Sequence, residues 1–138
     1  MRRFILDTGI AALYLSRDRA VFERAVEEVR AGNRVGIAAP VLAELAFRAE
    51  GSGKLRDQNI KRLREALQVW KLWLVDADVA FEYGRLAFEL RKRNRQIGQN
   101  DIWIAAIALS LGNATVVTRD SDFRGVPELT VENWAEPT

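Results

Sequence analysis

The sequence contains no cysteine and no histidine, and only three prolines and one methionine among its 138 residues. The absence of cysteine excludes a thiolate nucleophile and fits a reducing compartment. The absence of histidine excludes the imidazole, the side chain most often used for proton transfer at neutral pH. Any catalysis by this chain must therefore depend on other groups, and carboxylates are the most prominent candidates.

Long apolar runs are also absent. No stretch approaches the roughly 18 residues that a membrane span requires, and Asp7 comes too early for a secretory signal peptide. Hydrophobic residues make up 49% and charged residues 29% of the chain, as in ordinary globular proteins. We therefore expect a cytoplasmic protein that does not contact membranes, with residues 1–138 forming a single domain.

Neither sign of charge dominates, because the net charge is only +2. The high pI of 9.3 is compatible with this value, since almost nothing titrates between the carboxylates and the lysines when histidine is missing. The positions of the cations are more informative than their number. The arginines that could guide a phosphate backbone, or equally lie on solvated helix ends, are Arg17, Arg19, Arg91, Arg93 and Arg95.

Short β-branched and apolar runs alternate with amphipathic segments along the chain. Strands are predicted at residues 3–6, 35–38, 71–75, 115–118 and 129–132. Helices are predicted at residues 10–15, 19–31, 40–50 and 100–111. A long amphipathic helix is predicted after Gly53, with Ile60, Leu63 and Leu67 on one stripe, and another is predicted from a cap at Asp76 or Asp78 to about residue 94. This alternation predicts an α/β fold, with helices covering both faces of a mainly parallel sheet of four to five short strands.

Four carboxylates stand where a parallel sheet would collect a ligand. Asp7 and Asp120 follow predicted strands, and ligands of such sheets gather at the carboxyl ends of the strands. Glu44 and Asp101 lie on helices that are apolar in nearly every direction, where an isolated charge is costly. If the four converge, their mutual repulsion should raise some carboxylate pKa values in the metal-free protein, and a hard divalent cation would relieve it.

Each acid also has a local interpretation. Asp7 could cap a turn, and Asp7-Thr8-Gly9 matches the triplet of aspartic proteases, although those enzymes are nearly all strand. Glu44 could pair with Arg48 one helical turn later.

Asp101 could merely be stabilised by the positive end of the helix dipole at its helix N-terminus, where Asn100 is the expected cap. Asp120 and Asp122 could belong to a polar turn, and either could bind a metal directly or through water.

Five segments that span nearly the whole chain form a recognisable pattern: 5–8, 39–45, 97–106, 117–123 and 126–134. Taken in order, these segments resemble the PIN-domain ribonucleases, and specifically the VapC-type toxins of toxin–antitoxin modules.

The resemblance implies an α/β/α sandwich that holds Mg²⁺ or Mn²⁺ on Asp7, Glu44, Asp101 and Asp120. It further implies endonucleolytic cleavage of tRNA, rRNA or mRNA, a homodimer, and a VapB-type antitoxin. The family often has Asn or Ser two residues after the first aspartate, where this chain has Gly9, which predicts the loss of one side-chain hydrogen bond. Thr8, Asn100 and Thr118 are the expected supporting residues.

Three functional hypotheses follow. The first is a metal-dependent endoribonuclease in which direct attack by water leaves a 5′-phosphate and does not require the RNA 2′-hydroxyl. The second is a catalytically weak module of the same fold that binds RNA or protein. The third, a phosphoryl-accepting receiver domain, lacks a suitable late lysine and leaves Glu44 unexplained.

Overall fold

The computed structural model describes residues 1–135, which fold around one parallel sheet. The strands are β1 (Arg3–Leu6), β2 (Arg34–Ala38), β3 (Lys71–Trp73), β4 (Ala114–Val117) and β5 (Thr130–Glu132). They lie in the order β3-β2-β1-β4-β5, and every neighbouring pair is parallel. The predicted α/β class and the predicted strand number are therefore confirmed.

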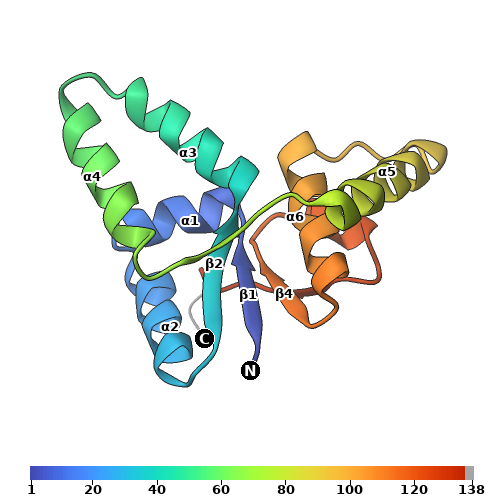
Figure 1. The fold of residues 1–138 in the computed structure, drawn as a ribbon, viewed down its shortest axis with the longest axis horizontal. Helices are drawn as coiled ribbons and strands as arrows, with labels where there is room; N and C mark the ends of the chain where they lie inside the picture. The colour runs from blue at the N-terminus through green and yellow to red at the C-terminus, as the bar shows by residue number, and fades with distance from the viewer. Residues whose placement is uncertain (136–138) are drawn as a thin grey trace.

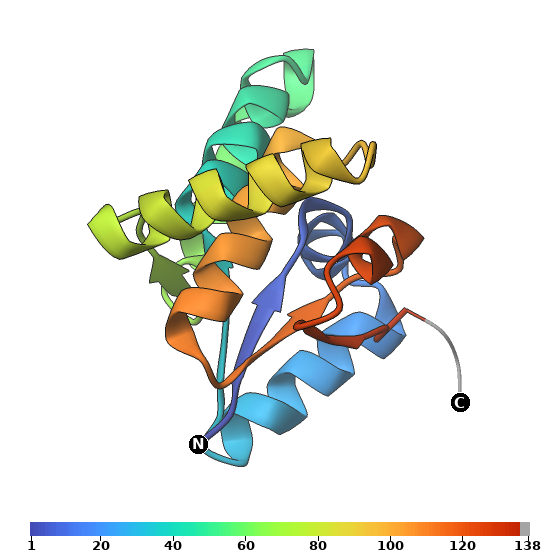
Figure 2. The same cartoon turned by 90° about the vertical axis from the view of Figure 1, so that its right-hand side faces the viewer.

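Helices cover both faces of this sheet (Figure 1). The helices are α1 (Thr8–Leu15), α2 (Arg19–Arg30), α3 (Ala39–Glu50), α4 (Arg56–Ala66), α5 (Ala77–Lys92) and α6 (Gln99–Leu111), with short 3₁₀ turns η1 (Gly53–Leu55) and η2 (Ser121–Gly125). Helices α1, α2 and α4 lie on one side, whereas α5 and α6 lie on the other. Figure 2 shows the sheet between these layers. None of the helices in residues 1–135 is long and apolar enough to cross a membrane.

The residues of the central strand β1 explain why helices must cover both faces of the sheet. Phe4, Ile5 and Leu6 are consecutive, point to alternate faces, and are all completely buried. A strand that is apolar on both faces is typical of parallel sheets between helical layers. Because β1 is central and β4 is its neighbour, the residues that follow these two strands are brought side by side.

Two local predictions were wrong. The first helix was predicted to begin at residue 10, but Thr8 and Gly9 already lie in the first turn of α1, because the Asp7 carboxylate caps the amide of Ile10. Asn100 was predicted to cap the helix that precedes β4. Helix α6 instead begins at Gln99 after Gly98, and no side chain caps it, so the Asn100 amide is available for another contact.

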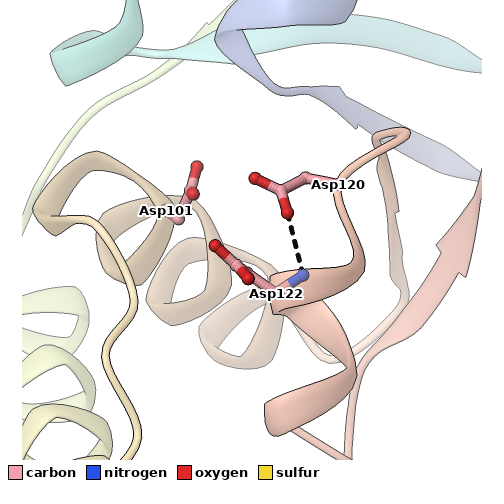
Figure 3. Close-up of side chains that lie close together, drawn as sticks. All are labelled: Asp101, Asp120 and Asp122. Atoms are coloured by element: carbon pink, nitrogen blue, oxygen red, sulfur yellow. Dashed lines mark hydrogen bonds between the residues drawn. The ribbon is translucent and has the colours of Figure 1, made fainter.

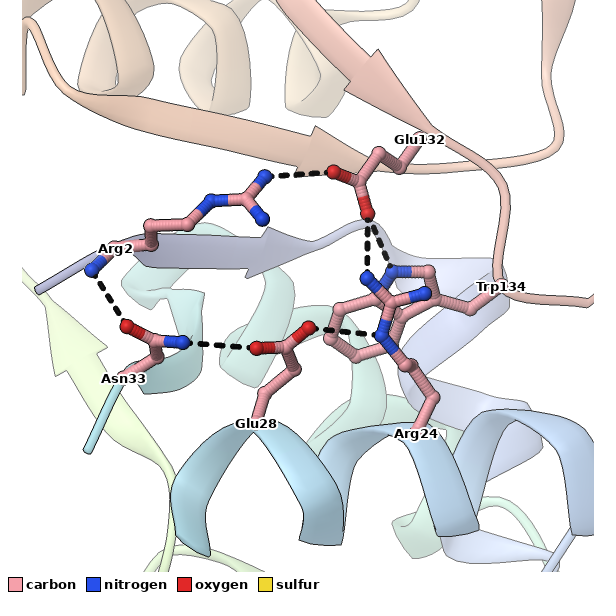
Figure 4. A network of polar contacts seen from close by, with 6 residues as sticks. All are labelled: Arg2, Arg24, Glu28, Asn33, Glu132 and Trp134. Atoms are coloured by element: carbon pink, nitrogen blue, oxygen red, sulfur yellow. Dashed lines mark hydrogen bonds and ion pairs between the residues drawn. The ribbon is translucent and has the colours of Figure 1, made fainter. Parts of the chain in front are cut away.

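A polar cluster ties the edge strand β5 to the opposite end of the chain (Figure 4). Glu132 accepts hydrogen bonds from Arg2 at 2.8 Å, from Arg24 at 3.2 Å and from the Trp134 indole at 3.0 Å. The main-chain carbonyl of Glu132 also accepts a hydrogen bond from the amide of Thr118 at 2.9 Å. The cluster therefore holds the strand against which the end of β4 is positioned.

Candidate active site

The predicted acids meet at the carboxyl end of the sheet, where β1 and β4 end beside α3 and the start of α6. They line an open cleft of about 890 Å³. The residues that line it are Asp7, Thr8, Gly9, Glu44, Gly98, Gln99, Asn100, Asp101, Arg119, Asp120 and Ser121. The cleft thus contains the four carboxylates that the sequence singled out, although they come from four distant segments.

Asp7 is the most deeply placed of these acids, with 7% of its surface exposed. Its Oδ1 accepts a hydrogen bond from the amide of Ile10 at 2.8 Å, and its Oδ2 accepts one from the Thr118 hydroxyl. Burial raises the pKa of Asp7, while these two hydrogen bonds partly oppose the rise. The carboxylate is therefore rigidly oriented.

Glu44 projects from α3 and is surrounded by donors. Its Oε2 accepts hydrogen bonds from the Thr8 hydroxyl at 2.8 Å and from the Asn100 amide at 2.9 Å. Its Oε1 accepts one from the Arg48 guanidinium, also at 2.8 Å. Burial acts to raise the pKa of Glu44, but the hydrogen bonds and the charge of Arg48 outweigh it and hold the pKa below its usual value. The predicted pair with Arg48 is thus confirmed, and it coexists with a position in the cleft.

Asp101, Asp120 and Asp122 form a separate acidic group (Figure 3). Asp101 lies in the first turn of α6, Asp120 follows β4, and Asp122 lies in η2. Each offers one carboxylate oxygen, and these oxygens lie within 4.8 Å of one another. The amide of Asp122 donates to Asp120 at 2.9 Å, so the local capping interpretation of Asp120 also holds.

Asp101 carries the clearest sign of unbalanced negative charge. Burial, followed by the charges of Asp7, Asp120, Asp122 and Glu44, raises its pKa from an ordinary 3.8 to about 6. Repulsion among the converging carboxylates thus contributes to the raised pKa of Asp101, as the sequence predicted, although burial is the larger cause. Such a group is unfavourable in isolation and is relieved by a bound cation.

The donor set fits a hard divalent ion. Only oxygen ligands are offered, which suits Mg²⁺ or Mn²⁺ and not a soft metal. Oxygens that share one such ion are roughly 3–4 Å apart, so the group formed by Asp101, Asp120 and Asp122 requires only small side-chain movements to reach that spacing. These three aspartates, with Asp7 beside them, could hold a metal.

The predicted supporting residues all contact the acids. Thr8 and Asn100 donate to Glu44. Thr118 donates to Asp7 and accepts a hydrogen bond from the amide of Asp120 at 2.9 Å, so it links two acids. Gly9 lies beside them, and a Cβ placed there would lie 3.7 Å from the Asp7 Oδ1, an ordinary contact. A larger residue would therefore fit at this position.

The arginines predicted to contact RNA do not line the cleft. Arg17 packs over the ring of Phe22, and Arg19 pairs with Glu23. Arg91 and Arg95 line a smaller cavity near the end of α5, where Arg93 ends the helix. Their role in binding RNA remains a prediction.

Two arginines that the sequence did not single out for the site lie closest to the acids. Arg119 lines the cleft, and its charge lowers the pKa of Asp7. Arg48 contacts Glu44 directly. Adjacency to Asp120 could have identified Arg119, whereas the sequence left Arg48 as an ordinary helical ion pair.

Comparison with known proteins agrees with this geometry. The PIN domain family matches residues 4–129. The chain is 33% identical to ribonuclease VapC2 of Rickettsia felis over 132 residues, which cover 95% of this chain and 97% of that protein. It is 30% identical to ribonuclease VapC1 of Haemophilus influenzae strain R2866 over 135 residues, covering 96% and 98% of the two chains.

Solved structures show the same likeness. A chain in the complex of VapBC2 from Rickettsia felis with a promoter DNA fragment superposes with a TM-score of 0.86 at 32% identity, covering 96% of this chain and 98% of that chain. A chain of VapBC-1 from nontypeable Haemophilus influenzae gives a TM-score of 0.84 at 30% identity, with 97% and 99% covered. The chain therefore belongs to the PIN-domain family and, within it, to the VapC ribonucleases. The resemblance drawn from the sequence is confirmed.

Proposed function

We propose that this chain is a metal-dependent endoribonuclease and the toxin of a VapBC-type toxin–antitoxin pair. One observation carries the proposal: Asp7, Glu44, Asp101 and Asp120 line a single open cleft in which negative charge is only partly balanced. A catalytically weak RNA- or protein-binding module would have no need of this costly arrangement.

In this proposal Asp101 and Asp120 are direct metal ligands, Asp7 and Glu44 complete the site, and Asp122 contributes directly or through water. Mg²⁺ or Mn²⁺ bound there would supply Lewis acidity at the scissile phosphate and lower the pKa of a water molecule. Thr118 keeps Asp7 oriented through its hydroxyl, and Thr8 and Asn100 do the same for Glu44. These contacts fix the acids before substrate arrives, which reduces the reorganisation needed during the reaction.

The RNA backbone would approach the open side of the cleft. Arg119 is the cation that lines the cleft itself, so we assign it a contact with a phosphate. Arg17, Arg19, Arg91, Arg93 and Arg95 lie further out and would act by attracting the polyanion over a longer distance. Whether the target is tRNA, rRNA or mRNA, attack by water would leave a 5′-phosphate.

The partners in this proposal are a VapB-type antitoxin and a second copy of the chain. The solved structures of similar chains are VapBC complexes, which supports the antitoxin. The homodimer is supported by large apolar side chains on α3 and α5. Phe47 and Phe81 are each 80% exposed and Phe88 is 60% exposed, more than a stable monomer usually leaves in water. A cytoplasmic location remains a prediction from the sequence.

Replacing Asp7 tests the catalytic assignment. We expect Asp7→Asn to lower RNA cleavage by at least about 100-fold, because the cleft loses a charge that supports the metal. Circular dichroism should show an unchanged fold, since the amide oxygen can still cap α1. Cleavage is measured on total RNA with Mg²⁺ and with EDTA, and cleaved ends are mapped by sequencing.

The matched control is Asp18→Asn, which changes the N-cap of α2 in the same way but lies outside the cleft. This variant should cleave RNA at the wild-type rate. If Asp7→Asn cleaves as fast as the wild type, Asp7 has no part in the reaction. If the wild type binds RNA equally well in EDTA and never cleaves it, the binding-module hypothesis is correct instead.

A further inference from the structure

The two oxygens of Glu44 are held in different ways. Oε2 accepts two hydrogen bonds, from Thr8 and Asn100, and both donors are part of the rim of the cleft. Among residues 1–135, Oε1 accepts only the Arg48 guanidinium, at 2.8 Å. Since a carboxylate oxygen has two acceptor sites, Oε2 is saturated and Oε1 is the oxygen with capacity left for a cation.

The acids opposite differ from Glu44 in this respect. Within residues 1–135, neither Asp7 nor Asp101 nor Asp120 forms an ion pair with an arginine or a lysine. Glu44 is thus the acid of the cleft that a protein cation directly neutralises, as judged over residues 1–135. The only carboxylate of the cleft whose charge is balanced by an ion pair within residues 1–135 is therefore Glu44.

We propose that Arg48 is an internal counterion that competes with the metal for Oε1 of Glu44 and so raises the metal concentration at which Glu44 joins the metal centre. Arg48 is then a positioning residue, since it acts through Glu44. This inference rests on the proposed metal-dependent function of the same cleft.

The geometry allows this contact to be reversible. The Arg48 side chain is 56% exposed, so water screens its pair with Glu44 and the side chain can leave the carboxylate. Arg48 also lines a neighbouring groove of about 230 Å³ between α1, α3 and α4, so the guanidinium has open space on the side away from Glu44. A divalent ion at Oε1 would repel the guanidinium over a few ångströms, so each cation weakens the binding of the other to Glu44.

Direct metal binding is the appropriate measurement, because it does not depend on RNA cleavage. Mn²⁺ is titrated into the full-length protein, and free Mn²⁺ is followed by electron paramagnetic resonance. We expect Arg48→Gln to bind Mn²⁺ about 3- to 10-fold more tightly than the wild type, because no positive charge then opposes the ion at Oε1 of Glu44. Arg48→Lys keeps the charge at the same helical spacing and should stay within about twofold of the wild type.

Two further variants separate the proposed route from a general charge effect. Arg85→Gln removes the same charge from another helical ion pair, with Glu82 on α5, and should leave Mn²⁺ binding unchanged. In a Glu44→Gln background, Arg48→Gln should no longer tighten Mn²⁺ binding, because the contested carboxylate is gone. The double-mutant cycle therefore measures the coupling between Arg48 and Glu44.

The outcomes are distinct. If the wild type binds Mn²⁺ and Arg48→Gln binds it no more tightly, the competition is refuted while the proposed nuclease function stands. An equal gain in the Glu44→Gln background would also refute it, since the effect would not pass through Glu44. Failure of the wild type to bind Mn²⁺ at all would overturn both the metal centre and this inference. If Arg48→Gln does not fold, Arg48→Met, which keeps the apolar stem, gives the same test.

Discussion

The Asp7 carboxylate takes part in local structure and in the cleft at the same time. One oxygen caps helix α1 through the amide of Ile10, and the other accepts the Thr118 hydroxyl. The local interpretation of Asp7 as a capping residue is therefore confirmed, and its carboxylate also lines the cleft, whereas its role in catalysis stays a prediction. A carboxylate that satisfies buried donors and still lines a cleft is held in one orientation, which is what a metal ligand requires.

Thr118 offers a test of this orientation. We expect Thr118→Val to lower RNA cleavage by about 10- to 100-fold, because Asp7 loses a donor and the amide of Asp120 loses its acceptor. Thr118→Ser, which keeps the hydroxyl, should recover most of the activity. Cleavage is compared at saturating Mg²⁺.

The control is Thr115→Val, because Thr115 is a buried threonine on β4, the strand that ends just before Thr118, and does not line the cleft. It should cleave RNA normally. Activity of Thr118→Val equal to that of the wild type would show that the hydroxyl does not position the acids.

Among the elements, β2 and β3 approach each other unusually closely at Gly36. A Cβ added there would lie 1.8 Å from the carbonyl oxygen of Lys71, with which Gly36 is in register. Neighbouring main chains fill this space, and a main-chain atom cannot move aside as a flexible side chain can. The pairing of β3 with the sheet therefore depends on a residue without a side chain.

We expect Gly36→Ala to destabilise the protein by about 3 kcal/mol or more, because the strands must separate to admit the methyl group. Gly84→Ala is the matched control. Gly84 lies within α5 with nothing within 4 Å of the added Cβ, so alanine should stabilise the helix by about 0.5–1 kcal/mol. Urea unfolding measures both values, and opposite signs are the expected result. Equal stability of Gly36→Ala and the wild type would contradict the close approach.

For the whole molecule, the charge of the cleft should govern how stability depends on pH. The pKa values of Asp7 and Asp101 are raised in the fold, that of Asp101 to about 6 from an ordinary 3.8. A raised pKa means that the folded state holds the proton more tightly than the unfolded state. The stability that these groups contribute is therefore present below pH 4 and is lost as pH rises through about 6. Glu44 and Glu132 have lowered pKa values, and their contribution is lost in the opposite direction, as pH falls below about 4.5.

We therefore expect the metal-free protein to be most stable near pH 5, and to lose about 1–2 kcal/mol between pH 5 and pH 7.5 once solvent screening of the half-exposed Asp101 is allowed for. Mg²⁺ should reduce this loss, because it binds the ionised carboxylates. The measurement is urea unfolding in EDTA and in Mg²⁺ at both pH values. Asp101→Asn should flatten the profile in EDTA. Stability in EDTA that rises steadily from pH 5 to pH 7.5 would contradict this account.

Features of this protein that depend on short-range patterns could be predicted from the sequence, whereas contacts between distant residues could not. The α/β class followed from the alternation of apolar strands and helices, and the four acids were identifiable because two follow strands and two interrupt apolar helices. The contacts that the supporting residues make with the acids could not be predicted in this way. Asn100 was predicted to cap α6, yet its amide donates to Glu44, 56 positions earlier in the chain. Nothing in the local sequence distinguishes these two uses of an asparagine.

The amino-acid sequence by itself determined which side chains are available for chemistry and the order of strands and helices that carries them. Both depend on residue type and on short-range periodicity, which can be read along the chain. Only the tertiary structure decided that Asp101, Asp120 and Asp122 bring oxygens within 4.8 Å of one another, that Asn100 donates to Glu44, and that the arginines near the end of α5 lie outside the cleft. Those outcomes depend on how the strand ends and helix ends are packed in three dimensions, because a charge is balanced only by the groups that lie within a few ångströms of it.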